Sequence, residues 1–225
     1  MKQNEIWLIN LAPTARVKIR IALLLLFIWS IPLAAQPVKN YYDNGQLRES
    51  GLLENGRKNG RWDFYYPDGT RQATEYYLND TLHGPVTYYD FDGNLSGQEN
   101  WVHGMLQDSA YYYHPNGNLE KKGLYKDGLY EGIWQFYYPN GRLRKVVGYH
   151  RGEPHGIWRY YTDKGLLLQE GQYAHGKETG EWKFYNKKGR LLYVGSYHNG
   201  QRVGEWYIVD KRGRKKPVDY SGWDN

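Results

Sequence analysis

Residues 132–156, GIWQFYYPNGRLRKVVGYHRGEPHG, contain one complete unit of the pattern that fills most of this chain. Residues 133–138 and 143–149 alternate in polarity and are rich in aromatic and β-branched side chains, as strands are. Pro139-Asn140-Gly141 between them is a turn sequence, and Arg151-Gly152 begins a second turn. The unit is therefore predicted to be one β-hairpin, followed by a turn that leads into the next copy.

The unit recurs every 24 residues between about residues 41 and 213, without insertion or deletion. Its most regular marker is the glycine of the first turn, at Gly45, Gly69, Gly93, Gly117, Gly141, Gly165, Gly189 and Gly213. A fixed period indicates a repeat architecture, in which each unit packs only on its neighbours. We expect an all-β fold: residues 36–213 form an elongated, twisted antiparallel sheet of successive β-hairpins, and residues 214–225 form a polar C-terminal tail.

One column of the repeat is predicted to form the core. Tryptophan occupies it in five copies, at Trp62, Trp134, Trp158, Trp182 and Trp206, with Val86 and Ala110 in the other two. The residue two positions later is usually aromatic and lies on the same face, because successive strand side chains point to opposite faces. Strand glycines such as Gly123, Gly171 and Gly195 leave room for an indole from the facing strand.

The opposite face carries a column of tyrosines, the Tyr ladder, which provides the candidate binding residues Tyr65, Tyr89, Tyr113, Tyr137, Tyr161 and Tyr185. Its neighbours are often polar, for example Asp63 and Lys183, so this face is predicted to be the wetter one. Exposed tyrosine rings in a row are suited to a sugar chain or a partner protein. Stacking between equivalent residues, which stabilises a sheet, explains the column equally well.

The copies between residues 70 and 109 depart most from the pattern. Arg71, Glu75, Asp80 and Asp108 replace the expected leucine or glycine. This stretch is predicted to be the least regular part of the array and, with the Tyr ladder, a place where function is encoded.

The residue inventory argues against an active centre. There is no cysteine, no nucleophile-elbow serine, no carboxylate dyad and no phosphate-binding glycine loop before a helix. Histidines in equivalent columns lie two or three repeats apart, at about 9.6 Å per repeat, which is too far to share a metal. His150-x-x-Glu153-x-His155 is the only local ligand-like group, and we interpret it as turn polarity. No enzyme activity, cofactor or metal is predicted.

Residues 1–35 have the pattern of a secretory signal peptide. Four basic residues precede the apolar run at residues 21–31, and small residues follow, with a cleavage site expected near Ala35. The alternative is a retained membrane anchor, although the run is shorter than the ~20 residues of a spanning helix. Export to the periplasm, the cell surface or the medium is expected.

The net charge of +6 falls to +3 when residues 1–35 are removed. This charge is a weak argument for nucleic acid, and no nucleic-acid partner is expected. The basic residues between 211 and 216 are suited to anionic lipid or polymer, but a solvated terminus explains them equally well.

Tyr137-Tyr138-Pro139-Asn140-Gly141-Arg142-Leu143, continued by Tyr149, Gly152, Gly156 and Trp158, resembles the bacterial variant of the MORN repeat. The resemblance covers about residues 40–213 and implies an antiparallel sheet of hairpins that acts mainly in protein–protein association, and in some members in membrane apposition. Many bacterial members are labelled antitoxins, which fits poorly with export, because an antitoxin normally meets its toxin in the cytoplasm. A looser similarity to choline- and glucan-binding repeats differs in the Gly–Trp spacing.

The sequence therefore predicts an exported, non-enzymatic repeat scaffold that mediates protein–protein interaction at the cell envelope. One alternative is a glycan- or cell-wall-binding module that uses an exposed aromatic face. A second alternative is an antitoxin-like partner of a toxin.

Overall fold

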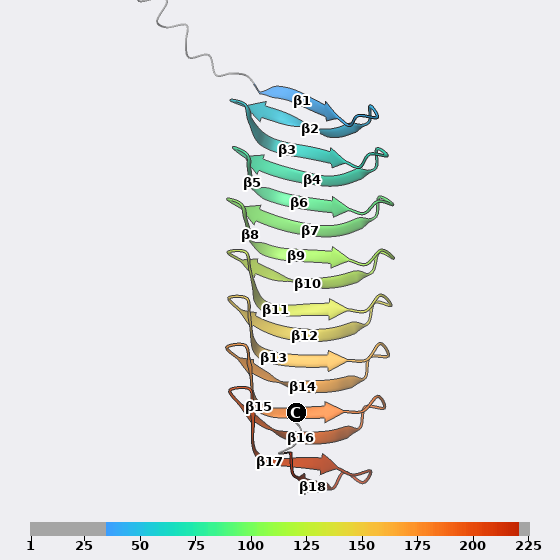
Figure 1. Ribbon diagram of the computed structural model, residues 1–225, viewed down its shortest axis with the longest axis vertical. Helices are drawn as coiled ribbons and strands as arrows, with labels where there is room; N and C mark the ends of the chain where they lie inside the picture. Colours follow the sequence, from blue (N-terminus) through green and yellow to red (C-terminus); the bar gives the residue numbers. More distant parts are fainter. Residues whose placement is uncertain (1–34, 221–225) are drawn as a thin grey trace, which may run out of the picture. The chain divides into compact units, whose positions relative to one another are not determined.

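The computed structural model describes residues 35–220, which form one antiparallel sheet in which strands pair in chain order (Figure 1). The strands are β1 (Gln36–Tyr41), β2 (Leu47–Glu54), β3 (Arg57–Tyr65), β4 (Arg71–Leu78), β5 (Thr81–Leu82), β6 (Gly84–Tyr89), β7 (Leu95–Val102), β8 (Met105–Leu106), β9 (Asp108–Tyr113), β10 (Leu119–Lys126), β11 (Leu129–Tyr137), β12 (Leu143–His150), β13 (Glu153–Tyr161), β14 (Leu167–Ala174), β15 (Lys177–Tyr185), β16 (Leu191–His198), β17 (Gln201–Val209) and β18 (Lys215–Val218). The predicted all-β fold of successive hairpins is confirmed.

Helices are absent from residues 35–220, so this part of the chain has no helix that could span a membrane. The signal peptide predicted at residues 1–35 lies, apart from Ala35, outside the described residues.

The turns along one edge of the sheet, at the right of Figure 1, close the hairpins. In the unit at residues 132–156, Tyr138 N donates to Arg142 O at 2.8 Å and Gly141 N donates to Tyr138 O at 2.8 Å. Gly141 has a φ of +80°, which glycine adopts without the steric cost of a Cβ atom. The recurring turn glycine therefore has a backbone function in the fold.

The turns along the other edge join one repeat to the next. His175-Gly176 is an example in which both residues have positive φ, +51° and +74°, as the tight type I′ hairpin requires. Gly176 N also donates to Pro154 O of the preceding repeat at 3.0 Å. These turns therefore connect strands and also bind neighbouring repeats together.

A bulge places each buried indole. Between the paired residues 122–135 and 124–131, β10 has one residue, Gly123, whereas β11 has three, Gly132 to Trp134. The extra length turns the Trp134 ring over Gly123, and its Nε1 donates to Leu124 O at 3.0 Å. Trp62, Trp182 and Trp206 lie over Gly51, Gly171 and Gly195 in the same way. The predicted aromatic layer, with room provided by strand glycines, is confirmed at these four positions.

Trp158 differs from the other four tryptophans. Val147 occupies the place of the strand glycine and pairs with Trp158, so the indole is only half-buried. Its Nε1 donates to the Gln169 side chain at 3.4 Å instead of to a backbone carbonyl. The predicted core column is therefore less buried at this repeat, because a valine side chain fills the space that the indole would use, although Trp158 still packs against the core.

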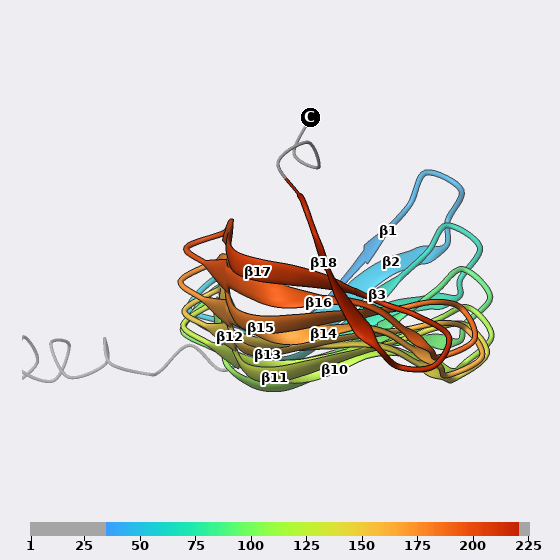
Figure 2. The ribbon, with the colours of Figure 1, turned by 90° about the horizontal axis from the view of Figure 1, so that it is seen from below.

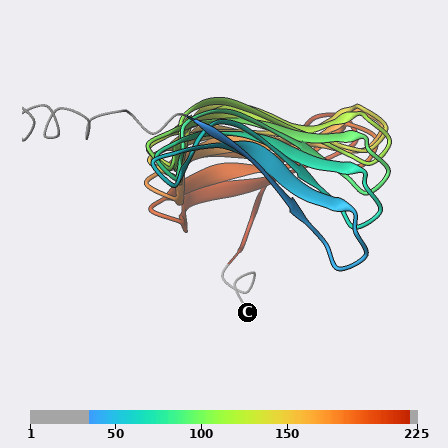
Figure 3. The same ribbon diagram turned by 90° about the horizontal axis from the view of Figure 1, so that it is seen from above.

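The strands are curved, which gives the sheet a concave face (Figures 2 and 3). β18 runs toward the concave side (Figures 2 and 3). The ring of Tyr220, which follows β18 in the sequence, lies 6.0 Å from the Trp206 ring. The tryptophan column therefore lines the concave face. β18 also pairs with β17, so part of the predicted polar tail forms the last strand of the sheet.

The middle repeats are the irregular part, as predicted. The strand that is continuous elsewhere is divided here into β5 and β6, and again into β8 and β9. Asp108, which follows the second break, has a φ of +65°, and Asp80, in the turn before β5, has a φ of +66°. Asp80 replaces the usual turn glycine, yet its N–H still bonds to the preceding repeat, at Lys58 O.

Candidate functional site

In the middle of the array, the concave face carries glutamates and lacks tryptophans of the core column. Where Val86 and Ala110 replace tryptophan, the glycine on the preceding strand is also replaced, by Glu75 and Glu99 respectively. A glutamate fits at the position of the strand glycine because no indole covers that position in these repeats. The two substitutions are thus coupled, and they place carboxylates in the aromatic layer.

Glu99 is the more buried of these two carboxylates. It is 9% exposed and accepts hydrogen bonds from Tyr88 Oη at 3.1 Å, Trp101 Nε1 at 3.0 Å and Tyr112 Oη at 2.5 Å. The Tyr125 hydroxyl lies 3.2 Å from that of Tyr112 and extends the network to the next strand, β10. These bonds satisfy a carboxylate that would otherwise be costly to bury.

The same network keeps its tyrosines protonated. Burial raises the pKa of Tyr88 and Tyr112, and the Glu99 carboxylate raises both further. Burial is also the main reason that the pKa of Tyr125 rises to about 12. The network therefore consists of neutral donors around one acceptor, which suits a structural role better than proton transfer at neutral pH.

The predicted binding residues, the Tyr ladder, lie on the opposite, polar face and are all half-buried. Tyr185 Oη donates to Glu170 at 2.7 Å, Tyr113 Oη donates to Gln98 at 3.2 Å, and Arg71 lies 6.0 Å from the Tyr65 ring. Within residues 35–220, no ring contact joins two of the six tyrosines. The structure thus places them on one face, as predicted, but in contact with polar neighbours.

Exposed apolar side chains are concentrated in the middle repeats. Of the thirteen most exposed large apolar side chains of residues 35–220, eight lie between residues 78 and 133. Four of them flank three successive turns on the left edge of Figure 1. This apolar turn patch consists of Leu78, Val102, Met105 and Leu129, which are 41–48% exposed.

Hydrogen bonds between repeats hold the patch in place. Gly104 N donates to Leu82 O, and Gly128 N donates to Leu106 O, both at 2.9 Å. At the equivalent positions, other repeats carry polar residues, such as Glu54 and Arg57 or His198 and Gln201. The patch is therefore specific to the middle of the array.

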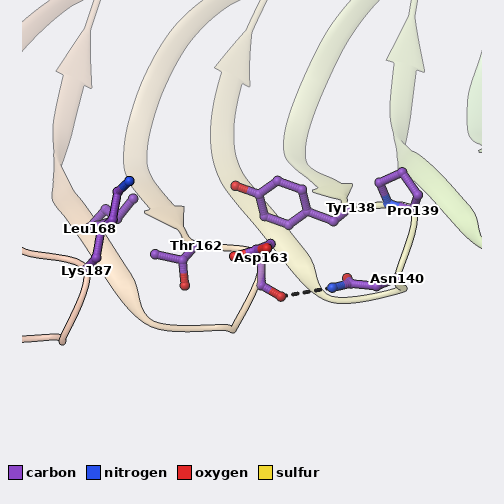
Figure 4. Close-up of a pocket in the computed structure, with 7 residues that line it drawn as sticks. All are labelled: Tyr138, Pro139, Asn140, Thr162, Asp163, Leu168 and Lys187. Atoms are coloured by element: carbon purple, nitrogen blue, oxygen red, sulfur yellow. Dashed lines mark hydrogen bonds between the residues drawn. The ribbon is translucent and has the colours of Figure 1, made fainter.

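A shallow hollow lies between successive turns on the other edge, lined by Tyr138, Pro139, Asn140, Thr162, Asp163, Leu168 and Lys187 (Figure 4). Asn140 Nδ2 donates to Asp163 O at 2.9 Å, and Tyr138 Oη donates to Tyr161 O at 2.8 Å. These hydrogen bonds link successive repeats. The Tyr138 ring and Pro139 form the apolar part of the lining of the hollow.

Two pairs of histidines lie close together in the structure, although the sequence pattern did not predict either pair. The rings of His83 and His103 are 4.9 Å apart, and those of His155 and His175 are 5.6 Å apart. The members of each pair are 20 residues apart in sequence, in different columns of the repeat. The repeat pattern relates histidines of the same column only, and these pairs join different columns. Their proximity follows from the arrangement of the turns in space.

Residues 35–220 form an open sheet of repeats whose core is a layer of side chains on one face. The family described as MORN repeat variant matches residues 37–55, 82–103, 109–127 and 130–150. Each matched segment covers one hairpin of the sheet, apart from the first residue of β1, β9 and β11. The MORN-variant model therefore matches four hairpins of the sheet, in agreement with the sequence resemblance.

No curated protein matches the sequence. Among solved structures, the chain is similar to a GtfA/B complex bound to UDP and GlcNAc, with 11% identity, a TM-score of 0.21, and coverage of 65% of this chain and 25% of that chain. For a TcdB2-TccC3-TEV structure the identity is 17% and the TM-score 0.23, with coverage of 80% of this chain and 12% of that chain. A protein of unknown function from Bacteroides fragilis has 10% identity and a TM-score of 0.12, with coverage of 83% and 91%. This chain thus spans a quarter or less of the first two chains, and such low TM-scores carry no functional argument.

Proposed function

We propose that the chain is an exported, non-enzymatic repeat scaffold that binds a partner protein at the cell envelope. The observation that carries this proposal is the apolar turn patch, Leu78, Val102, Met105 and Leu129, on an otherwise polar edge. Exposed apolar side chains grouped on a rigid surface favour protein association. The MORN-variant repeats supply a rigid sheet that presents this surface.

A photo-crosslinking residue introduced in place of Val102 tests the proposal in intact cells. We expect a crosslinked product of higher mass that contains a second protein. Val203, which is similarly exposed at 38% in the last repeats, provides the matched control position. Crosslinks of equal yield from both positions, or from neither, would contradict a binding surface at the patch.

Export is supported by the order of basic, apolar and small residues within residues 1–35. Fractionation of the host cells, followed by mass spectrometry of the intact chain, tests it. We expect a chain that begins near Gln36 outside the cytoplasm. Recovery of the whole chain in the cytoplasm would contradict export and would revive the antitoxin-like alternative.

Glycan binding is a second candidate, favoured by the half-buried tyrosines on the polar face. Aromatic rings beside polar groups are suited to sugar chains. Retention of the chain on insoluble cell wall should be lost when Tyr137→Ala and Tyr161→Ala are combined. Unchanged retention would remove the Tyr ladder as the site.

A further inference from the structure

A cluster of three histidines lies where two successive turns meet on the edge that joins repeats. The His150 and His155 rings are 6.0 Å apart, and the His155 and His175 rings are 5.6 Å apart. Together with Arg151 and Glu153 they line one hollow at the surface. We propose that His150, His155 and His175 bind a divalent transition-metal ion such as Zn²⁺.

The spacing of the rings fits this ion. With Zn–N bonds of about 2.0–2.1 Å, two imidazoles on one tetrahedral zinc have ring centroids about 5 Å apart. In residues 35–220, no three histidine or acidic side chains already converge on one point. All three histidines are exposed, and the proposal requires their side chains to turn toward a common ion.

A carboxylate orients one of the three ligands. His150 Nδ1 lies 3.0 Å from Glu131 Oε1, and Glu131 Oε2 accepts the Arg151 N–H, also at 3.0 Å. A carboxylate on one imidazole nitrogen leaves the other, Nε2, directed to a metal, as in many metal sites.

The remaining groups determine the expected affinity. Glu153, beside the cluster, provides an oxygen for a fourth coordination position. Arg151 lines the same hollow and opposes a cation. We therefore expect micromolar binding, weaker than at a closed structural zinc site.

The array contains its own comparison site. His83 and His103 stand 72 residues before His155 and His175 and form the same type of pair. Leu78 replaces the third histidine there, and Asn59 replaces the orienting glutamate. His83 Nδ1 also lies 3.4 Å from His103 N and is occupied by that contact. This pair has only two ligands and should bind metal more weakly.

Titration calorimetry of the full chain with ZnCl₂, without a histidine tag, tests the proposal. We expect one micromolar site, weakened at least ~10-fold by His155→Gln or His175→Gln. Glu131→Gln should weaken it by about 10-fold through His150. His83→Gln and His198→Gln, the latter at the position equivalent to His150, should leave the site unchanged.

Circular dichroism and the Tm without metal show whether each variant is folded. Co²⁺ in place of Zn²⁺ gives a second readout, because tetrahedral ligation produces intense visible absorption bands. Absence of Zn²⁺ binding to the wild-type chain would overturn the proposal. Equal affinity in the folded His155→Gln and His175→Gln variants, or equal weakening by His83→Gln, would also overturn it.

Discussion

The indole of Trp134 lies flat over Gly123 of the neighbouring strand, so close that a Cβ atom on Gly123 would be 2.3 Å from Trp134 Cδ2. This contact recurs at three other repeats and gives a single sheet a buried layer without a second sheet. The stability of the array therefore depends on glycine as much as on tryptophan.

Gly123→Ala should destabilise the array by about 1–3 kcal/mol, because the methyl group displaces the indole. In a Trp134→Ala background the same change should cost much less, since the obstacle has gone. Urea unfolding of the four chains of this double-mutant cycle measures the coupling. Gly97→Ala, where the nearest ring atom is 3.3 Å away, is the control. Equal costs of Gly123→Ala in both backgrounds would contradict the stacking account.

Trp134→Ala should cost about 3–5 kcal/mol, the range for a fully buried large side chain. Trp158→Ala should cost less, since Val147 keeps that indole half-buried. The Tm of each variant provides the comparison. A larger loss from Trp158→Ala would mean that this repeat carries more of the stability than its burial indicates.

The tyrosines around Glu99 predict a loss of stability at high pH. In the unfolded chain they ionise near pH 10, whereas burial and Glu99 raise the pKa of Tyr88 and Tyr112 in the folded chain. Their contribution to stability is therefore complete below about pH 10 and is lost as the pH rises above it. The Tm measured between pH 8 and 12 should fall above pH 10.

Glu99→Gln should reduce this pH dependence, because it removes the charge that disfavours tyrosinate while retaining an acceptor oxygen. Absorbance titration near 295 nm follows tyrosine ionisation directly, and some tyrosines should then ionise at lower pH than in the wild-type chain. An unchanged titration curve would show that burial alone raises these pKa values.

Much of the fold was predictable from the 24-residue period. Equivalent columns predicted the hairpins, the glycine turns, and the match between Trp134 and Gly123. The lower burial of Trp158 was not predicted, because Val147 acts through packing that a single column does not show. The Glu99 network was also missed, since its donors come from three strands and two columns: Tyr88 and Tyr112 are equivalent residues of adjacent repeats, and Trp101 belongs to another column.

The candidate site was less predictable than the fold. The sequence indicated the irregular middle copies, but the apolar turn patch depends on which side chains remain exposed. The contact between His155 and His175 arises from the tight turn at His175-Gly176, which reaches back toward the preceding repeat. Periodicity aligns equivalent residues and therefore gives no information on contacts between different columns.

Affinity capture from envelope extracts tests the interaction scaffold most directly, with the wild-type chain compared with a Val102→Asp, Leu129→Asp double variant. Val203→Asp, at an exposed position outside the patch, is the control. We predict one or more proteins enriched equally by the wild-type chain and the control, and at least ~10-fold less by the double variant, because a charge opposes burial of the patch. The same proteins at the same level on all three chains would contradict the account.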